Sequence, residues 1–416
     1  MSEVVIVGAG FGGLAAAKEL DGAPVHVTIV DQHNYHTFQP LLYQVATAGL
    51  NAADVAYAVR GIFQRQDNVS FRQARVTGVD WATNTLRLDR GSLAFDHLIV
   101  AAGASAAYFG VEGAAQYGFP LYALTDAIAL RNHVLERFEA ADADPSLIDD
   151  GALCFVVVGG GPTGVEVAGA LSELFAMVLR RDFPTLDVSR ARILLVEMAD
   201  TVLQPFSSPS QRHASERLTE MGVEVRTGEA VVRVTPTRVA LKFGEELASH
   251  TLIWAAGVRA NPLAEALGVP TRRGGRIAVG PDLRIEGQHN AFAIGDIAAI
   301  TGSDGELLPM LAQVAMQSAR HAAREIAQPR HKSFRYRDIG TMATIGRRAA
   351  VAELPLHIRL WGTPAWVAWL GLHLVTLVGF RNRLSVFLNW AWNYLTYDRG
   401  PRLIIEAPPP ESPLRE

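Results

Sequence analysis

One pattern occurs twice in the sequence: a run of β-branched residues, a glycine-rich turn and an Ala- and Leu-rich segment predicted to be helical. The copies, VVIVGAGFGGLAAAKEL and CFVVVGGGPTGVEVAGALSEL, share the spacing G-x-G-x-x-G, formed by Gly8, Gly10, Gly13, Gly159, Gly161 and Gly164. The first glycine of such a motif permits a tight turn, the second lets backbone approach a pyrophosphate, and the third lets the helix pack closely on the strand. Two copies in this context predict two dinucleotide-binding folds.

An acidic residue ends the next predicted strand after each copy. These residues are Asp31, in HVTIVDQH, and Glu197, in ILLVEMAD. A carboxylate at this place accepts hydrogen bonds from ribose hydroxyls and repels a 2′-phosphate, so Glu197 predicts a preference for NADH over NADPH. Glu197 lies beyond the usual offset of about 20 residues, and we expect a lengthened helix plus a loop over FAMVLRRDFPTLDVSRAR. The alternative is that each acid simply ends a strand at the surface.

The duplication extends to DHLIVAAGASA (96–106) and HTLIWAAGVRA (250–260). Their small residues, Gly103 among them, allow backbone to pass close to a bound cofactor. The fold class is therefore predicted as α/β, with two Rossmann-like dinucleotide-binding domains, the second inserted in the first, and a C-terminal amphipathic helical region. The predicted domains cover residues 1–118 with 262–330, residues 119–261, and residues 331–416.

Charge and cysteine content exclude several classes of function. The net charge of -4 provides no overall positive field for a nucleic-acid partner. The single cysteine, Cys154, excludes an intramolecular disulfide and a redox-active cysteine pair. No metal-ligand motif is predicted. A strand-like run begins within three residues of Met1, so no secretory signal is expected and the nucleotide-binding part is predicted to be cytoplasmic.

Near its end the chain becomes unusually apolar. Residues 360–380 contain about the 20 residues that a membrane span needs, but Gly362, Pro364 and Gly371 interrupt them. At helical period, large side chains fall within an arc of about 100°, predicted to be lipid-facing: Val367, Leu370, Leu374, Leu377 and Val378. Small residues lie on the other side: Ala365, Ala368 and Gly379. A second segment repeats the theme with Leu384, Phe387, Leu388, Ala391 and Leu395 on one face.

Aromatic residues and arginines flank this apolar region, including Trp390, Trp392, Arg381 and Arg399. Both residue types favour the headgroup zone of a bilayer, and arginine favours anionic lipid. We therefore expect a helix pair that lies on the membrane surface. An apolar core, an oligomer contact or a true span are the alternatives.

The residues resemble the two-dinucleotide-domain flavoproteins and, among them, the type II NADH dehydrogenases (NADH:quinone oxidoreductases). The resemblance covers nearly the whole chain. It is carried by GAGFGG, NYHTFQPLLYQVATAGL, GGGPTGVEVAGALSE, FAIGD, LPMLAQVAMQSA and GFRNRLSVFLNWAWNYLTYDRGPRLI. The glycine motifs alone would not separate subfamilies; the FQPLLYQVA, AQVAMQ and tail segments are specific.

The resemblance implies non-covalent FAD in the first domain and NADH as substrate in the second. It implies hydride transfer from NADH to flavin, then two electrons to a membrane quinone, without proton pumping. Such enzymes attach to one face of the membrane, here expected to be the cytoplasmic face of the inner membrane. By motif, the FAD residues would be Gly8, Gly10, Gly13, Asp31, Gly103 and Asp296, and the NADH residues Gly159, Gly161, Gly164 and Glu197.

The resemblance also names candidates for catalysis and for quinone contact. Glu166 of GPTGVE is expected near the flavin and nicotinamide, or is merely a first-turn acid favoured by the helix dipole. Gln313 and Gln317 of AQVAMQ share a helix face and are expected beside the flavin and the quinone headgroup. Residues 35–44 form either a core plug or an apolar passage to the flavin. The candidates for the quinone passage are Leu42, Gln44, Gln313, Gln317 and Arg381.

Three positions depart from the family pattern. The chain has Ser318-Ala319 where glycine often follows the second glutamine, Arg381 where lysine is common, and Ala102 where threonine is common. These departures weaken detailed carry-over of quinone contacts but not of the reaction. The alternatives are an FAD- and NAD(P)H-dependent oxidoreductase with a soluble acceptor, or an NADH-sensing flavoprotein that does not turn over. A homodimer is also left open.

Overall fold

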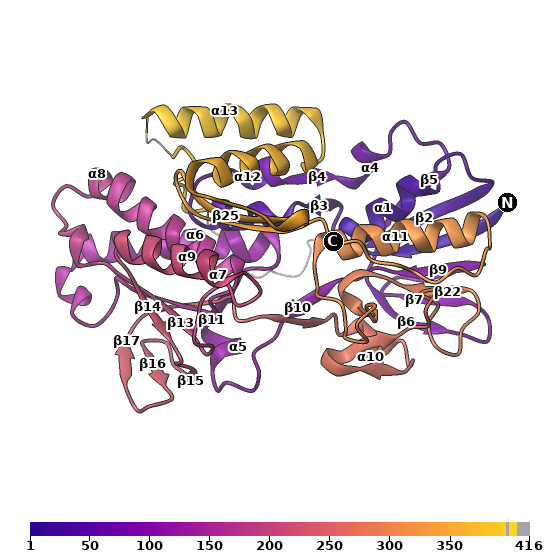
Figure 1. Ribbon diagram of the computed structural model, residues 1–416, viewed down its shortest axis with the longest axis horizontal. Coiled ribbons are helices and arrows are strands. Elements are labelled where there is room, and N and C mark those ends of the chain that lie inside the picture. Colours follow the sequence, from indigo (N-terminus) through magenta and orange to yellow (C-terminus); the bar gives the residue numbers. More distant parts are fainter. Residues whose placement is uncertain (397–398, 406–416) are drawn as a thin grey trace, which may run out of the picture. The chain divides into compact units, whose positions relative to one another are not determined.

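The protein divides into two compact units, each built from discontinuous segments (Figure 1). The computed structural model describes residues 1–396 and 399–405. The first unit comprises Met1–Thr37, Ala56–Ala107 and Gly257–Gly340. The second comprises Phe38–Val55, Tyr108–Ala256 and the chain from Thr341 onward.

The first unit is organised around a five-stranded parallel sheet in the order β22-β9-β1-β2-β5. Its strands are β1 (Ser2–Val7), β2 (Val25–Asp31), β5 (Val69–Gln73), β9 (His97–Val100) and β22 (Ala291–Ala293). Val4, Val5 and Ile6 are buried without alternation, as expected for a parallel sheet covered on both faces. Helices α1 (Phe11–Glu19) and α11 (Ala312–Ala327) pack against each other.

Short elements complete the first unit. An antiparallel sheet joins β6 (Val76–Asp80), β7 (Thr85–Leu88) and β8 (Ser92–Ala94), and a second sheet joins β20 (Thr271–Arg272), β21 (Arg276–Ala278) and β23 (Ala298–Ala299). Paired strands are β3 (Tyr35–Thr37) with β4 (Ala56–Ala58), and β10 (Ala104–Ala106) with β19 (Val258–Ala260). The remaining helical segments are α4 (Val59–Ile62), α10 (Leu263–Ala266), η5 (Arg273–Gly275) and η6 (Gly295–Ile297).

The second unit repeats the same sheet plan. Its strands are β11 (Gly118–Pro120), β12 (Cys154–Val158), β13 (Arg192–Glu197), β14 (Val223–Thr227) and β18 (Thr251–Trp254), in the parallel order β11-β18-β12-β13-β14. Strand β18 lies beside β12 as β9 lies beside β1. The predicted duplication of the two Ala-Ala-Gly strands is confirmed.

A long helical segment follows the second glycine turn. Helix α7 (Pro162–Glu173) continues through a π-helical stretch, η3 (Leu174–Leu179), into α8 (Arg180–Asp182), and η4 (Val188–Arg190) precedes β13. The predicted lengthened helix plus loop before Glu197 is confirmed. Among the described residues, Pro162–Asp182 is the one helix long and apolar enough to cross a membrane. Two thirds of its apolar window is buried inside the protein, as in a core helix.

Further elements of the second unit surround this core. They are η1 (Gln39–Leu41), α2 (Leu42–Ala46), α3 (Ala52–Val55), α5 (Ala114–Tyr117), α6 (Leu124–Ala143), η2 (Pro145–Ile148), β15 (Val231–Val234), β16 (Arg238–Leu241), β17 (Glu246–Ala248) and α9 (Ser208–Glu220).

The C-terminal part of the second unit is a small sheet followed by two helices. The antiparallel sheet contains β24 (Thr341–Gly346), β25 (Ala349–Leu354) and β26 (Ile358–Trp361), with η7 (Pro355–His357) between the last two strands. Helix α12 (Gly362–Thr376) packs on β25, and α13 (Phe380–Thr396) follows. Gly379, with φ of +86°, makes the turn between the two helices. The apolar run of residues 360–380 is thus part strand, part helix and part turn.

Helix α7 and strand β24 meet at a glycine. A Cβ atom on Gly169 would lie 1.7 Å from the carbonyl oxygen of Ile345. No side chain fits there without moving backbone, so Gly169 sets how closely the C-terminal sheet packs on α7.

We expect Gly169→Ala to lower the free energy of unfolding by about 1–3 kcal/mol, because the added methyl group overpacks this contact. Thermal unfolding of the purified protein measures the change. Gly371→Ala is the matched control, since no atom lies within 4 Å of a Cβ built there. That variant should be neutral or stabilising, since alanine is the better helix former. Equal stability of the two variants would contradict the role of Gly169 in the packing of the C-terminal sheet on α7.

Candidate functional site

The first glycine-rich turn has the geometry of a dinucleotide cradle. Gly8 has φ of +105°, and its Cβ would lie 2.4 Å from the Ala101 carbonyl oxygen. A Cβ on Gly13 would lie 1.8 Å from the Gly8 carbonyl oxygen, so strand and helix are in close contact. Gly10, which caps α1, has open space where a Cβ would be. The N-terminal end of α1 can therefore face a pyrophosphate.

Two acids accompany this turn within the first unit. Asp31, at the end of β2, accepts hydrogen bonds from the backbone N–H groups of Ala9 (2.7 Å) and His33 (2.8 Å). Asp296 lies in η6, directly after Gly295. Gly295 has φ of +65°, and a Cβ there would meet Ala315 of α11 at 2.9 Å. Gly103, with φ of +68°, accepts a bond from the Asn261 N–H.

The second turn has nearly identical geometry. Gly159 has φ of +106°, a Cβ on Gly164 would lie 1.8 Å from the Gly159 carbonyl oxygen, and Gly161 has open space. Glu197 accepts hydrogen bonds from the N–H groups of Gly160 and Ala199. The acid at the strand end therefore holds the glycine turn in both units. Each carboxylate is therefore bonded to backbone at the glycine turn, and ribose contact stays a prediction for both acids.

The two glutamines of α11 face one neighbouring segment of the first unit. Gln317 donates to the Arg337 carbonyl oxygen (2.8 Å) and accepts from the Arg337 N–H (3.0 Å). Gln313 likewise bonds the Gly340 carbonyl oxygen (3.2 Å) and the Ile339 N–H (3.2 Å). Their shared face is as expected. Both amides hold the extended segment 337–340 in this structure, and contact with an electron acceptor stays a prediction.

The second unit contains an apolar pocket of about 600 Å³, here termed the α12–α13 pocket. Its walls are mostly carbon: Ala170, Val178, Trp366, Val367, Trp369, Leu370, Leu374, Phe387, Trp390, Ala391 and Leu395. Polar groups are few, and include Tyr43, Gln44, Glu166, Glu173 and Arg399. A mostly apolar cavity with a few convergent polar groups is the usual form of a small-molecule site. Leu42 is buried and Arg381 exposed, and neither lines this pocket.

Glu166 is the most perturbed acid of the pocket. Enclosure of its carboxyl group by the protein raises its pKa to about 8, although hydrogen bonds from the Thr344 N–H and the Trp369 indole act in the opposite direction. The carboxyl is therefore largely protonated at neutral pH. A neutral acid in an apolar pocket can donate a proton to a bound molecule.

A chain of hydrogen bonds runs beside this acid. The Trp390 indole donates to Gln44 Oε1 (2.8 Å), and Gln44 Nε2 donates to the Tyr43 hydroxyl oxygen (2.9 Å). Burial raises the pKa of Tyr43 well above its usual value, and the charges of Glu166 and Glu173 raise it further. Tyr43 is therefore a neutral hydroxyl. No local pattern singles out Tyr43 within residues 35–44, because its environment is formed by Glu166 and Glu173 of α7 and by Trp390 of α13, far along the chain.

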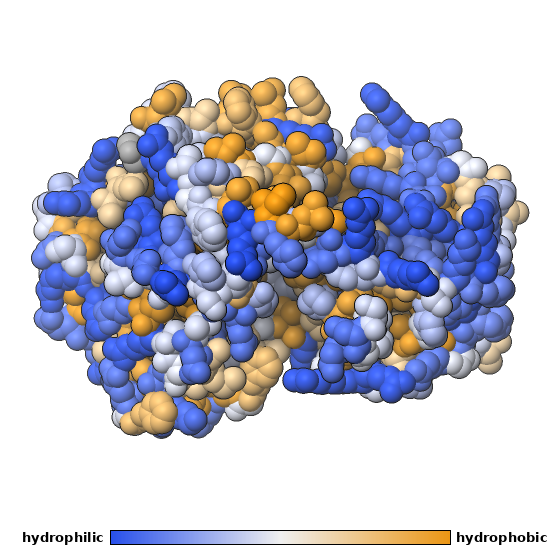
Figure 2. Space-filling model, viewed as in Figure 1, coloured by the Kyte–Doolittle hydropathy of each residue, from blue (hydrophilic) through white to orange (hydrophobic). Residues whose placement is uncertain are grey.

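Helix α13 is amphipathic, but its apolar side, rather than its polar side, faces outward. Its polar side faces the protein: Ser385 Oγ and Asn389 Nδ2 bond the two carboxylate oxygens of buried Asp54 (2.6 and 3.0 Å). Asn382 bonds the backbone carbonyl oxygens of Ala53 and Asp54. Its apolar side is exposed: Leu384, Phe387, Leu388, Trp392 and Leu395 are 48–77% accessible. Figure 2 shows hydrophobic side chains gathered over α12 and α13.

The predicted face of α13 is confirmed as an apolar face turned outward, whereas the predicted arc of α12 is wrong in part. Val367 is exposed and, like Leu370 and Leu374, lines the pocket, whereas Leu377, which follows the end of α12, is buried. Trp369, which the predicted faces did not include, is 1% exposed and packs on the protein as Ala365 does. The reason is the pocket itself, since large side chains are needed to form its walls. A solvated helix with an apolar outer face indicates a lipid contact.

Two folded dinucleotide cradles with an apolar site define a class, the pyridine nucleotide-dependent oxidoreductases. Residues 2–319 match the family described as pyridine nucleotide-disulphide oxidoreductase, and residues 339–397 match the NDH2 C-terminal domain. A Mycobacterium tuberculosis type II NADH:quinone oxidoreductase is 38% identical over 96% of this chain and 89% of its own length. One from Staphylococcus saprophyticus is 31% identical over 84% and 89%.

The chain belongs to the type II NADH:quinone oxidoreductase family. The fold agrees: the solved structure of NDH2 from Plasmodium falciparum, in complex with NADH, superposes with a TM-score of 0.89. That likeness covers 97% of this chain and 100% of the other, at 20% identity.

The raised pKa of Glu166 has a consequence for stability. Its folded pKa, about 8, exceeds that of an unfolded glutamate, about 4.3. The folded state therefore binds more protons between these values, and the free energy of unfolding falls as pH rises from about 4.5 to 8. We expect Glu166→Gln to remove this part of the pH dependence. Chemical denaturation at pH 5, 7 and 9 measures the free energy of unfolding. If this free energy changes equally with pH in wild type and variant, the raised pKa of Glu166 is refuted.

Attachment to lipid is tested on the exposed face of α13. We expect Leu388→Glu with Trp392→Glu to weaken binding to anionic vesicles roughly tenfold or more, because apolar burial is lost and charge is added. Vesicle co-sedimentation measures the affinity. Phe243→Glu is the control, since Phe243 is 73% exposed at a turn away from α12 and α13 in the second unit. Unchanged binding of the double variant would exclude α13 as the attachment surface.

Proposed function

We propose that this protein oxidises NADH and reduces a membrane quinone by two electrons, without pumping protons. The observation that carries the proposal is the α12–α13 pocket, an apolar cavity with a protonated acid, walled by helices whose outer surface is apolar. A water-soluble acceptor would not need this lipid-facing surface. A lipid-soluble quinone would reach the pocket from the bilayer.

The first unit is proposed to hold FAD without a covalent bond. The residues are Gly8, Gly10, Gly13, Asp31, Gly103 and Asp296, of which Gly8 and Gly13 provide the tight turn and Gly10 the open approach. FAD, when bound, supplies the chemistry that converts a hydride from NADH into two electrons for the quinone. Asp31 would accept the adenosine ribose hydroxyls.

The second unit is proposed to bind NADH through Gly159, Gly161, Gly164 and Glu197, by the same geometry. Its carboxylate would repel the 2′-phosphate of NADPH. The proposed assignment is FAD to residues 1–118 and 262–330, NADH to residues 119–261, and membrane attachment to residues 331–416. Phe38–Val55 and residues 108–118, although within the range proposed for FAD, belong to the compact second unit. FAD would therefore be held mainly by the strands of the first unit.

Within the quinone site, Glu166 and Gln44 are the proposed contacts of the headgroup, because both line the pocket. Glu166 would hold a proton for a quinone oxygen. Gln313 and Gln317 are proposed to act beside the flavin. Leu42 and Arg381 are proposed as parts of the passage, Leu42 by packing behind Tyr43 and Gln44 on α2, and Arg381 at the exposed start of α13.

We propose attachment to the cytoplasmic face of the cell membrane, where NADH is available and where anionic lipid attracts arginine. Arg381 and Arg383 at the start of α13 are exposed and suit this surface. Monomer and homodimer are both compatible with such attachment. Light scattering of the detergent-solubilised protein distinguishes them.

The test is turnover of the detergent-solubilised, flavin-loaded protein. We expect acid release of FAD at one per chain, rapid NADH oxidation with a soluble quinone analogue, and at least tenfold lower kcat/KM with NADPH. A protein reduced once by NADH that then remains reduced in the presence of quinone would refute the proposal and indicate a sensor. Turnover with a soluble acceptor protein but not with quinone would refute it in favour of a soluble-acceptor reductase.

A further inference from the structure

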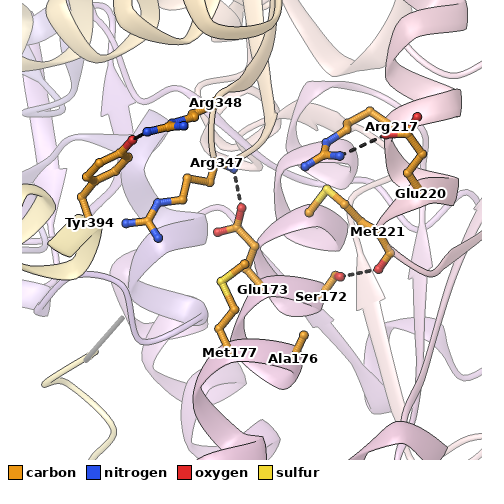
Figure 3. Close-up of a pocket in the computed structure, with 10 residues that line it drawn as sticks. All are labelled: Ser172, Glu173, Ala176, Met177, Arg217, Glu220, Met221, Arg347, Arg348 and Tyr394. Atoms are coloured by element: carbon orange, nitrogen blue, oxygen red, sulfur yellow. Dashed lines mark hydrogen bonds and ion pairs between the residues drawn. The ribbon is translucent and has the colours of Figure 1, made fainter. Parts of the chain in front are cut away.

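A second cavity of about 480 Å³ adjoins the α12–α13 pocket within the same unit. We term it the α9-side cavity, because Arg217, Glu220 and Met221 at the end of α9 form one wall (Figure 3). Four of its lining residues also line the α12–α13 pocket: Glu173, Met177, Arg347 and Tyr394. The two cavities therefore share one wall.

The α9-side cavity faces water. Arg348 and Glu220 on its lining are exposed, and Glu220 pairs with Arg217 at the rim (3.0 Å). Arg348 bonds the Tyr394 hydroxyl, and both Arg347 and Arg348 lie over the Tyr394 ring. Its lining is richer in charged side chains than that of the α12–α13 pocket, with Glu173, Arg217, Glu220, Arg347 and Arg348 around it.

Glu173 is the carboxylate in the shared wall. One oxygen accepts the Arg347 backbone N–H, and the other lies 3.3 Å from the Arg399 guanidinium. Its side chain is 16% exposed and that of Arg399 is 14% exposed. Arg399 in turn donates to the Thr47 and Ala170 carbonyl oxygens. Glu173 is thus a restrained acid with one side toward water and the other toward the apolar pocket.

Helix geometry relates Glu173 to Glu166. The two acids lie seven residues apart on α7, which places them on one face, about 10 Å apart along the axis. Ala170 lies between them and also lines the pocket. The charges of both carboxylates raise the pKa of the Tyr43 hydroxyl. The same hydroxyl accepts a hydrogen bond from Gln44 Nε2. The polar lining of the α12–α13 pocket thus includes both acids, Tyr43 and Gln44, together with Thr47, Thr344, Arg347, Asn393, Tyr394 and Arg399.

The proposed reaction needs a proton from water. Reduction of a quinone to a quinol takes up two electrons and two protons. Oxidation of NADH to NAD⁺ releases two electrons and one proton, so each turnover consumes one further proton from solution. A proton cannot cross apolar walls without titratable groups or ordered water.

We propose that the α9-side cavity is the proton inlet of this enzyme and that Glu173 carries protons from it to Glu166. In the first step, Glu166 gives its proton to a quinone oxygen. Glu173 then passes a proton toward Glu166 along the Tyr43 hydroxyl and pocket water, and regains one from the α9-side cavity. The inference rests on the proposed quinone reduction and adds to it the route of the solvent proton.

Charged and titratable groups face Glu173 from every element packed on it. They are Arg347 and Arg348 on the β24–β25 turn, Tyr394 on α13, Arg399 after α13, Tyr43 on α2, and Arg217 and Glu220 on α9. A purely structural ion pair between Glu173 and Arg399 is the competing interpretation. The experiment must therefore distinguish proton transfer by Glu173 from a purely structural role of its carboxylate.

The experiment uses full-length, flavin-loaded Glu173→Gln in detergent, with two acceptors. Reduction of a quinone analogue takes up protons, whereas ferricyanide accepts one electron at a time and takes up no proton. We expect the quinone-dependent kcat to fall tenfold or more with the ferricyanide rate unchanged within twofold. The loss should deepen as pH rises, and formate, a small acid able to enter the cavity, should restore part of the rate.

Two further variants complete the test. Glu216→Gln, exposed on α9 and lining neither cavity, should keep both rates. Glu173→Asp keeps an acid and should recover more quinone activity than the glutamine variant. The proposal is overturned if Glu173→Gln keeps its quinone rate, or if both acceptor rates fall together without rescue by formate. Failure of wild type with quinone, but not with ferricyanide, would instead reject the proposed function.

Discussion

The close contact of α7 with its neighbours is the constraint on which the second unit depends. Its first turn needs Gly164 against Gly159, and its middle needs Gly169 against the Ile345 carbonyl oxygen. These contacts hold one helix at a fixed depth between the nucleotide turn and the C-terminal sheet. The same helix then presents Glu166, Ala170 and Glu173 on one face to the α12–α13 pocket. The second glycine turn and the pocket proposed for the acceptor are thus linked through a single buried helix.

Helix α13 shows how the protein combines attachment with access. Asp54 is 7% exposed and accepts bonds from Ser385 and Asn389, so the polar side of α13 is held inward. The apolar side is left outward, with Leu384, Phe387, Leu388, Trp392 and Leu395 exposed in the part of the chain that the structure describes. Since Trp390 and Phe387 also line the pocket, the helix whose apolar face is exposed also encloses the pocket proposed for the acceptor.

The sequence predicted the architecture well because its signals are local. The glycine spacings, the strand-end acids Asp31 and Glu197, and the lengthened helix before Glu197 each depend on neighbouring residues. The outward face of α13 followed from its period. The face of α12 was predicted partly wrongly, because Leu370 and Leu374 serve a cavity rather than a surface. The polar stripe of Asn382, Ser385, Asn389 and Asn393, at helical spacing, was the overlooked signal for the contact with Asp54 and Gly49.

The sequence by itself determined two dinucleotide folds, one inserted in the other, and an apolar C-terminal region, because glycine conformation and side-chain period act over a few residues. Only the tertiary structure decided which polar groups share a cavity. Tyr43, Glu166, Glu173 and Arg399 come from distant segments, and their electrostatic coupling exists only after these segments pack. The pKa of Glu166 is likewise set by burial, to which residues far along the chain, Thr344 and Trp369, contribute. Burial and coupling are properties of the folded chain, so no local pattern could have carried them.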